Sequence, residues 1–271
     1  ALAPLLVVLP LLVAALLLWG NAAYDRLLIT KVRSDLAVAH GYFEQVLAEV
    51  GGGTASVGGS SALLRALQAG DPAALNRFLT ASRERLGLDF LTVSSPDNLT
   101  TPPAEPRVAR LAVLEQSQFE ALAPHLRDRR QIAIVPTRNA APSTRTVENR
   151  AMVMLAATAV TDDTGRVIAT LRGGILLNQN LPFIDHINRI VYPDGSLPLD
   201  SQGTATLFMG DVRITTNVRL FQDQRAVGTR VSQAVSDAVL QRGSTWLDRA
   251  FVVDDWYVSA YEPLEDGQGR R

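Results

Sequence analysis

An uncharged apolar segment at the start of the chain constrains its fold more than any other feature. Residues 2–19 read LAPLLVVLPLLVAALLLW and contain no Asp, Glu, Lys or Arg. As a helix this run would be about 27 Å long, close to the roughly 30 Å hydrocarbon core of a bilayer. Trp19 ends the run, where an interfacial aromatic anchor is expected. We therefore predict a transmembrane helix in residues 1–20.

The same run has a second interpretation, a secretory signal peptide that is cleaved from the mature protein. The apolar region of such signals usually spans about 7–15 residues, whereas this run is longer and continues into a helical pattern. Both points favour an uncleaved anchor. Under either interpretation we expect residues 22–271 to lie outside the cytoplasm, and an uncleaved anchor would hold them at the membrane.

Apolar residues recur at helical spacing directly after this segment. The stripe consists of Leu28, Val32, Leu36, Ala39, Phe43, Val46 and Val50. Steps of three and four residues place it on one helix face, which predicts a long stalk helix. That face packs on its own domain or also on a second copy, as in a homodimer. The Gly/Ser-rich residues 51–61 are predicted to form a flexible loop, and short helices capped by Ser60 or Ser61 and by Asp71 extend to residue 85.

From residue 86 the pattern changes to short strands and turns. Strands are predicted at residues 88–94, 131–135, 151–160 and 166–177, with a helix within 107–126 and a polar loop at 136–149. An irregular connection, residues 181–202, leads to a second strand-rich unit. There we predict strands at 204–209, 212–218, 249–253 and 256–261 around a helix that Gly243 ends. Antiparallel hairpins that enclose helices indicate the α+β class and not a parallel doubly wound sheet.

The composition offers little for catalysis or for binding metals and nucleic acids. The chain contains no cysteine and three histidines, His40, His125 and His186, none in a metal-binding spacing with another. No catalytic or phosphate-binding motif is present. The 26 basic and 27 acidic residues give a net charge of −1, which provides no general attraction to nucleic acid. We predict no catalytic residue, no metal and no cofactor.

Three arginines begin or lie within predicted strands: Arg150, Arg213 and Arg249. An arginine at the mouth of a small domain can bind a ligand carboxylate through two parallel hydrogen bonds. The same residue can equally be a solvated strand end or part of an internal ion pair. The sequence leaves both possibilities open for each arginine.

The second strand-rich unit contains a specific pattern. It reads GTATLFMGDVRITTNV, followed by VGTRVSQAVSDAVLQRGSTWLDRAFVVDDWYVSAYEPLEDGQGR. This pattern, D-x-R-I-x-T-N, then G-T-R-V-S, then W-Y-x-x-A-Y-x-P, resembles a Cache-type sensor module. Residues 86–180 resemble the membrane-distal half of double Cache domains from two-component sensor histidine kinases.

The resemblance implies an architecture and a class of ligand. After the membrane helix (1–20) and the stalk and short helices (21–85) come two PAS-like antiparallel-sheet modules. The distal module spans residues 86–180 and the proximal module residues 203–271, whose last strand is expected beyond Arg271. The ligand is implied to be a small solute such as an organic acid or an amino acid. Distal candidates are Arg150, Met152, Met154 and Arg172, and proximal candidates are Arg213, Thr215, Arg249, Trp256, Tyr257 and Tyr261. In double Cache receptors the distal pocket is the usual one.

These features predict a sensory function and not an enzyme. The chain is expected to be the ligand-sensing fragment of a receptor that carries a conformational signal across the membrane, with a histidine kinase as the implied output. Alternatives are the sensor of a chemoreceptor or of a cyclic-dinucleotide enzyme, or a membrane-anchored solute-binding protein without cytoplasmic output. The sequence that follows Arg271 in the full-length protein would discriminate among them.

Overall fold

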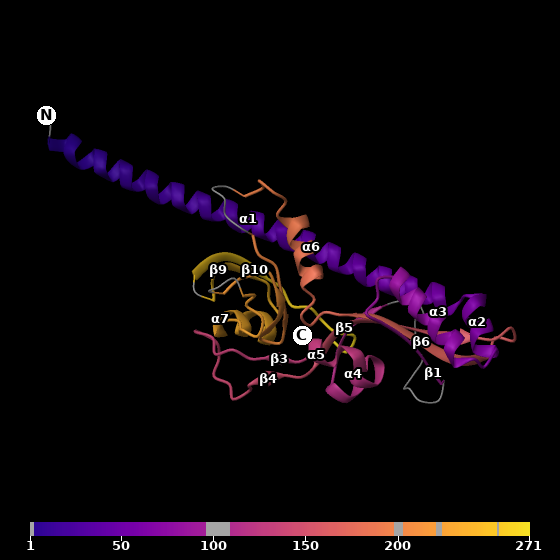
Figure 1. Ribbon diagram of the computed structural model, residues 1–271. Coiled ribbons are helices and arrows are strands. Elements are labelled where there is room, and N and C mark those ends of the chain that lie inside the picture. Colours follow the sequence, from indigo (N-terminus) through magenta and orange to yellow (C-terminus); the bar gives the residue numbers. More distant parts are fainter. Residues whose placement is uncertain (1–2, 96–108, 198–202, 221–223, 254) are drawn as a thin grey trace.

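One long helix forms the axis of the molecule. The computed structural model describes residues 3–95, 109–197, 203–220, 224–253 and 255–271. Helix α1 (Ala3–Gly58) projects at its N-terminal end, and the remaining elements pack along its C-terminal half (Figure 1). It contacts α6, β5, β6, β9 and β10. The predicted stripe is confirmed as the packed face, because Phe43 and Val50 are buried.

The predicted flexible loop at residues 51–61 is wrong, because α1 continues through Gly51, Gly52 and Gly53 to Gly58. Glycine costs roughly 1 kcal/mol per residue in a helix interior relative to alanine, but tertiary packing outweighs this preference. Thr54 and Val57 are buried in this last part of the helix. At Gly58 a β-carbon would lie 2.2 Å from Cγ2 of Thr158, so the glycine permits a close approach to the sheet.

Two short helices follow, with the predicted caps. The side chain of Ser60 accepts a hydrogen bond from the amide of Leu63 at the start of α2 (Ser61–Gln68). Asp71 accepts from the amides of Ala73 and Ala74 at the start of α3 (Pro72–Arg85). Both helices begin where local capping chemistry predicts.

A four-stranded antiparallel sheet packs on α1 in the order β1-β6-β5-β2. Its strands are β1 (Phe90–Ser94), β2 (Arg110–Leu114), β5 (Ala151–Thr161) and β6 (Val167–Leu176). Met152 and Met154 belong to the core that includes α1, whereas Val153 and Leu155 pack with Phe119 on the other face. Both faces are therefore covered, which explains the nearly continuous apolar sequence of β5.

Three further differences from the predictions concern helices and strands. Residues 107–126 contain strand β2 before helix α4 (Gln116–Leu122) and a 3₁₀ turn (Pro124–Leu126), and α5 (Arg127–Arg130) follows. Residues 131–149 contain the short pair β3 (Ile132–Ala133) and β4 (Val147–Glu148). The connection predicted as irregular contains helix α6 (Leu181–Val191). Pro182 does not prevent this helix, since it stands in the first turn, where proline is tolerated.

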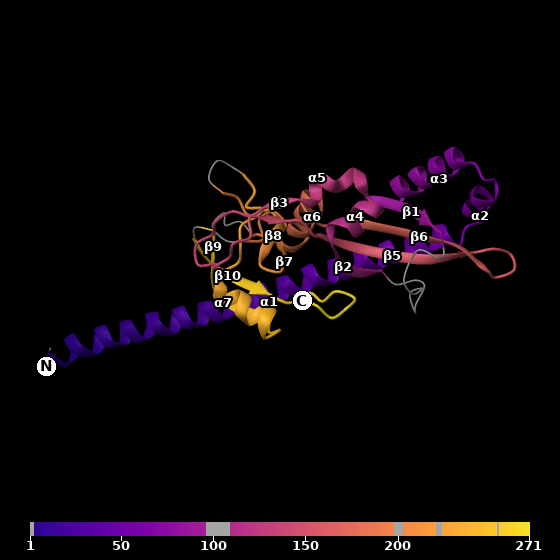
Figure 2. The same cartoon turned by 90° about the horizontal axis from the view of Figure 1, so that it is seen from below.

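The last part of the chain, here called the C-terminal unit, consists of two hairpins and a short helix. One hairpin pairs β7 (Thr206–Met209) with β8 (Val212–Thr216), and the other pairs β9 (Trp246–Val252) with β10 (Asp255–Tyr261). Helix α7 (Gln233–Ser236) continues as a π-helical turn (Asp237–Gln241) that ends before Gly243. Along α1, this unit lies nearer the projecting N-terminal end than the four-stranded sheet does (Figures 1 and 2).

The predicted membrane segment, residues 2–19, falls at the start of α1 and includes Leu2, which lies outside the described residues. Among the helices of the described part, none combines the length and apolar content that crossing a bilayer requires. The α+β class with antiparallel sheets is confirmed, and the membrane helix stays a prediction.

Candidate functional site

The most unusual polar side chain of the C-terminal unit is Arg213. All five residues of β8 are buried, and Arg213 is only 3% exposed. Its strand partner is Phe208 on β7, which packs with Trp246, Tyr261 and the apolar side chains of α7. Since directly opposed residues point to the same side of a sheet, the guanidinium of Arg213 enters this apolar cluster.

Arg213 has few polar contacts for a buried cation. Nη1 donates to the hydroxyl of Thr229, which in turn donates to the carbonyl of Ala226 at 2.7 Å. The guanidinium carbon lies 5.0 Å from the centroid of the Phe208 ring. Nε has no partner, and within the described residues no carboxylate forms an ion pair with Arg213. A desolvated cation–π contact contributes about 2 kcal/mol, less than the several kcal/mol that burial of a charge costs.

The pKa values of two residues reflect this enclosure. Burial lowers the pKa of Arg213 to about 10, and the negative charge that Tyr261 would carry partly opposes the shift. Burial raises the pKa of Tyr261, and the positive charge of Arg213 opposes that shift. Arg213 is therefore charged and Tyr261 neutral at neutral pH. The charge is retained although nothing in the described chain neutralises it, so an anionic group would be stabilised here.

The aromatic walls around Arg213 come from both hairpins. The rings of Phe208 and Tyr261 are 6.0 Å apart between centroids, and Trp246 is the strand partner of Tyr261. Trp246 Nε1 is buried without a hydrogen-bond partner. The π-helical turn supplies Ala238 and Val239 to the same cluster. Such turns are rare and frequently occur at functional sites.

The other predicted proximal residues lie apart from Arg213. A register shift between Leu207 and Phe208 places Thr215 opposite Leu207, which packs in the core on the α1 side. Tyr257 shares a face of the β9–β10 hairpin with Tyr261 but is 38% exposed. The remaining two, Trp256 and Arg249, lie on the opposite face, and Trp256 is 63% exposed.

The predicted distal residues are not gathered around one space. Met152 and Met154 are buried in the core beneath α1. Arg172 is the strand partner of Ala157, which puts it on the opposite face of the sheet, and it donates to Ser94 Oγ at 2.8 Å. Burial lowers the pKa of Arg172, and the charge of Arg110 lowers it further.

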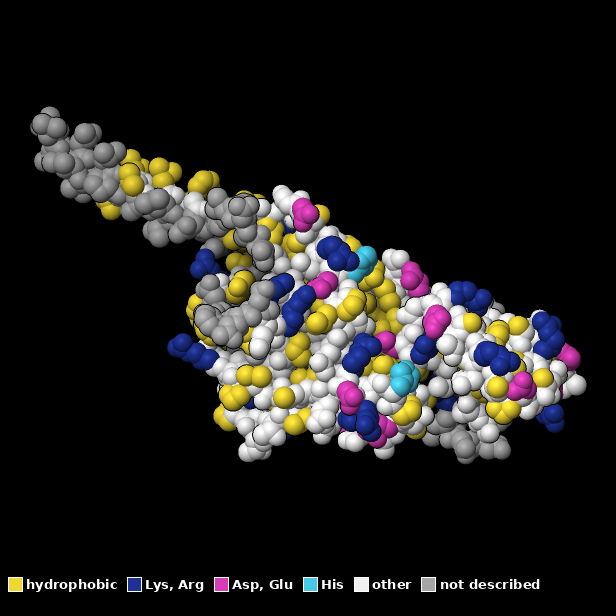
Figure 3. Space-filling view, in the orientation of Figure 1, with side chains coloured by type: hydrophobic (Ala, Val, Ile, Leu, Met, Phe, Trp, Pro, Cys, Tyr) yellow, Lys and Arg dark blue, Asp and Glu magenta, His cyan; other side chains and the backbone are white. Residues whose placement is uncertain are grey.

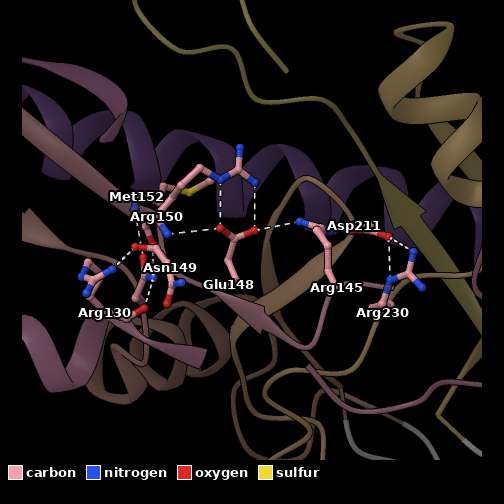
Figure 4. A network of polar contacts seen from close by, with 9 residues as sticks. Arg130, Arg145, Glu148, Asn149, Arg150, Met152, Asp211 and Arg230 are labelled. Atoms are coloured by element: carbon pink, nitrogen blue, oxygen red, sulfur yellow. Dashed lines mark hydrogen bonds and ion pairs between the residues drawn. The ribbon is translucent and has the colours of Figure 1, made fainter. Parts of the chain in front are cut away.

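Arg150 already has an anionic partner in the protein. Its Nε and Nη2 donate to the two carboxylate oxygens of Glu148 at 2.9 and 2.8 Å (Figure 4). Burial raises the pKa of Glu148, but the hydrogen bonds and charge of Arg150, together with the charge of Arg145, outweigh this and lower it. The fork of Arg150 that could bind a ligand carboxylate is thus occupied by Glu148.

Phe208, Thr229 and Trp246 belong to the site but were not predicted from the sequence. Thr229 lies in the G-T-R-V-S pattern, but it was not among the predicted ligand-binding residues. The roles of Phe208 and Trp246 depend on hairpin register, which a single sequence does not reveal. The predicted residues Arg213 and Tyr261 do share one site.

No metal site competes with the Arg213 site in the described part of the chain. No cluster of His, Asp and Glu side chains there could hold a metal ion. A surface groove of about 470 Å³ lies elsewhere, between α1, β2 and the segment after β10.

Comparisons with known proteins show what this chain is similar to. Two crystal structures of the periplasmic domain of Vibrio cholerae LuxQ are similar at 15% identity, with TM-scores of 0.48 and 0.47. They cover 85% and 86% of this chain and 95% and 98% of their own chains. A search of curated proteins gave no match. The family described as single cache domain 3 matches residues 175–271, and the family described as LuxQ, periplasmic, matches residues 32–192. The predicted Cache resemblance is thereby confirmed, and the chain belongs to the LuxQ periplasmic family as a Cache-type extracytoplasmic sensor domain.

Proposed function

We propose that the chain is the non-catalytic sensory region of a receptor in the bacterial inner membrane, with a sensor histidine kinase as the full-length protein. Residues 2–19 anchor it, residues 86–180 and 203–271 act as distal and proximal modules, and a small solute binds in the proximal module. The observation that carries the proposal is the charged, buried Arg213 without a carboxylate partner in the described chain. Family membership supports the sensory role.

The proposed anchor agrees with the surface of α1. Its projecting part exposes large apolar side chains, including Leu16 at 65% and Trp19 at 75% (Figure 3). Farther along, Leu27 is 70% and Val38 is 45% exposed. We propose that this second pair contributes to a homodimer along α1. Sedimentation of the chain in detergent tests this: Leu27→Glu should shift a dimer toward monomer, and a wild-type monomer at all concentrations contradicts it.

A direct connection leads from the proposed site to α1. Tyr261, the last residue of β10, packs against Phe208 beside Arg213. The next residue, Glu262, lies 2.7 Å from Nδ1 of His40 on α1 through its Oε1. A solute that displaces Tyr261 would therefore change the contact between the proximal module and the stalk.

The test uses the whole chain in detergent. Sugars, amines, amino acids, carboxylates and nucleosides are screened for a concentration-dependent rise in melting temperature. For any solute that binds, hydrogen exchange is then compared with and without it. We expect changed protection in β10 and in α1 near His40, and in Glu262→Gln we expect binding to persist while the change in α1 is lost.

Two results would contradict the proposal. One is that no class of solute changes the melting temperature. The other is that a solute binds but leaves the exchange of α1 unchanged, which would indicate a binding protein without transmission.

A further inference from the structure

We infer that the Arg213 site binds a small monocarboxylate with an apolar body, and neither an amino acid nor a dicarboxylate. The inference rests on the proposed function and specifies the ligand class of the same site. It uses three properties of the site: the free side of the guanidinium, the absence of other charges beside it, and the apolar walls.

The hydrogen-bonding atoms of Arg213 match one carboxylate. Nη1 is used by Thr229, whereas Nε has no partner and Nη2 makes no hydrogen bond to a described residue. Nε and Nη2 point in parallel from one edge of the guanidinium, and a carboxylate binds this edge through both oxygens. The indole Nε1 of Trp246 is a further donor without a partner in the same cluster.

The charges around the site exclude a second charged group on the ligand. Burial and Tyr261 alone shift the pKa of Arg213, and no described Asp or Glu forms an ion pair with it, so no carboxylate lies beside the guanidinium to receive the ammonium group of an amino acid. The nearest cation along the chain from Thr229 is Arg230, whose Nε donates to Asp211 at 2.7 Å and whose Nη2 also pairs with Asp211. It is therefore committed and cannot neutralise a second carboxylate.

The walls favour an apolar remainder. Phe208, Val231, Val235 and Tyr261 share the cluster into which Arg213 points. With Trp246 Nε1 donating to the carboxylate, a further hydroxyl or amine among these side chains would lose its hydrogen bonds to water, whereas methyl and methylene groups gain from burial. Access requires α7 to move away from the hairpins, and the π-helical turn (Asp237–Gln241) is the irregular element that faces the site.

The experiment compares four probes that differ by one group each. Propionate is the carboxylate with a short apolar body, propionamide removes its charge, alanine adds an ammonium group, and succinate adds a second carboxylate. Melting temperatures of the whole chain in detergent are measured against each probe, with sodium chloride at matched ionic strength as the control. Propionate should raise the melting temperature with concentration, and the other three probes and chloride should not.

Two substitutions locate the effect. Arg213→Met should abolish the response to propionate and, because it removes a buried unpaired charge, should itself raise the melting temperature by about 3 °C without ligand. Arg213→Lys keeps the charge without the fork, and should weaken propionate binding at least about tenfold. Arg172→Met, on the distal sheet, should respond like the wild type.

The outcomes separate this inference from the proposed function. A response to amines or sugars alone, or a propionate response that survives in Arg213→Met and Arg213→Lys, overturns the carboxylate site but leaves a solute sensor. A propionate response lost in Arg172→Met and kept in Arg213→Met also overturns it. Absence of any response in the full solute screen contradicts both.

Discussion

Arg145 and Asp211 join the segment around the β3–β4 pair to the C-terminal unit. Nη2 of Arg145 lies 2.6 Å from Oδ1 of Asp211, which is in the turn between β7 and β8 (Figure 4). Nη1 of the same guanidinium donates to Glu148 on β4 at 3.0 Å. On its other side Asp211 pairs with Arg230, whose Nη1 donates to the carbonyl of Ala141. The two parts are thus linked by a chain of alternating charges.

Breaking this chain should cost stability in proportion to burial. Arg145 is 42% exposed, so Arg145→Gln should lower the free energy of unfolding by about 1 kcal/mol. Asp211→Asn should cost about 3 kcal/mol, because Arg230, 10% exposed, loses its anionic partner. Denaturant unfolding measures both. Arg127→Gln is the control, since Arg127 is 71% exposed and should change stability by less than about 0.5 kcal/mol. Equal changes in unfolding free energy for Arg127→Gln and Asp211→Asn would show that the charged link contributes nothing to stability.

Glu148 predicts part of the acid sensitivity of the fold. The pKa of Glu148 in the folded protein lies below its ordinary value of 4.5. The ionised carboxylate therefore stabilises the fold at pH values above 4.5, and this contribution is lost as the pH falls through the pKa of the folded state. Glu148→Gln should therefore flatten the dependence of unfolding free energy on pH between about pH 5 and pH 3. The slope should not vanish, because the Thr164 hydroxyl and the Arg166 amide also lower the pKa of Asp162. Asp163→Asn, in the exposed turn, should retain the wild-type slope, and an unchanged slope in Glu148→Gln would refute the prediction.

Two glycines of α1 should respond to alanine in opposite directions. At Gly52 a β-carbon meets nothing within 4 Å, so Gly52→Ala should stabilise the protein by about 1 kcal/mol through helix propensity. At Gly58 it would lie 2.2 Å from Thr158 Cγ2, and the overlap should destabilise the protein by about 1–3 kcal/mol. Thermal unfolding of the two variants is the measurement. If both variants are stabilised, helix α1 does not pack on β5 as described.

Asn178 should be one of the costliest polar side chains to remove. It is fully buried, accepts from the amide of Met152 at 2.9 Å and donates to the carbonyls of Arg130 and Arg150 at 2.7 and 2.9 Å. Asn178→Ala leaves these backbone groups without partners and should cost about 3 kcal/mol in denaturant unfolding. Asn76→Ala, at an exposed position of α3, should be neutral or slightly stabilising. A loss below about 1 kcal/mol for Asn178→Ala would mean that water replaces its contacts.

Features that depend on local sequence could be predicted. The stripe through Phe43 and Val50 follows from helical periodicity, and the caps at Ser60 and Asp71 follow from side chains that bond amides two or three residues away. The hairpin turn between β5 and β6 could also be predicted, because Asp162 accepts hydrogen bonds from backbone amides two and four residues away. None of these requires knowledge of a distant residue.

Features that depend on residues far away in the sequence could not be predicted. At Gly53 of α1 a β-carbon would lie 2.9 Å from Leu86 Cδ2, a residue far along the chain, and Phe183 and Ile184 of α6 pack in the core with α1. At the site, Arg213 and Tyr261 were predicted from the family pattern, but the bulge in the β7–β8 hairpin that separates Thr215 from Arg213 has no signal in one sequence. An internal ion pair was one of the alternatives for Arg150, but Glu148 was not identified as its partner, although only one residue separates them in the chain.

The contacts along helix α1 also determine which part of the molecule can move relative to the helix. It contains 56 residues, which makes it a rod about 84 Å long that hardly stretches along its axis. The four-stranded sheet packs closely on the C-terminal end of α1, where Gly58 approaches Thr158, so this end has little room to move. Glu262, directly after β10, contacts α1 at His40, whose side chain is 42% exposed. A displacement that begins at β10 therefore reaches α1 first at His40, ahead of the close contact between Gly58 and Thr158.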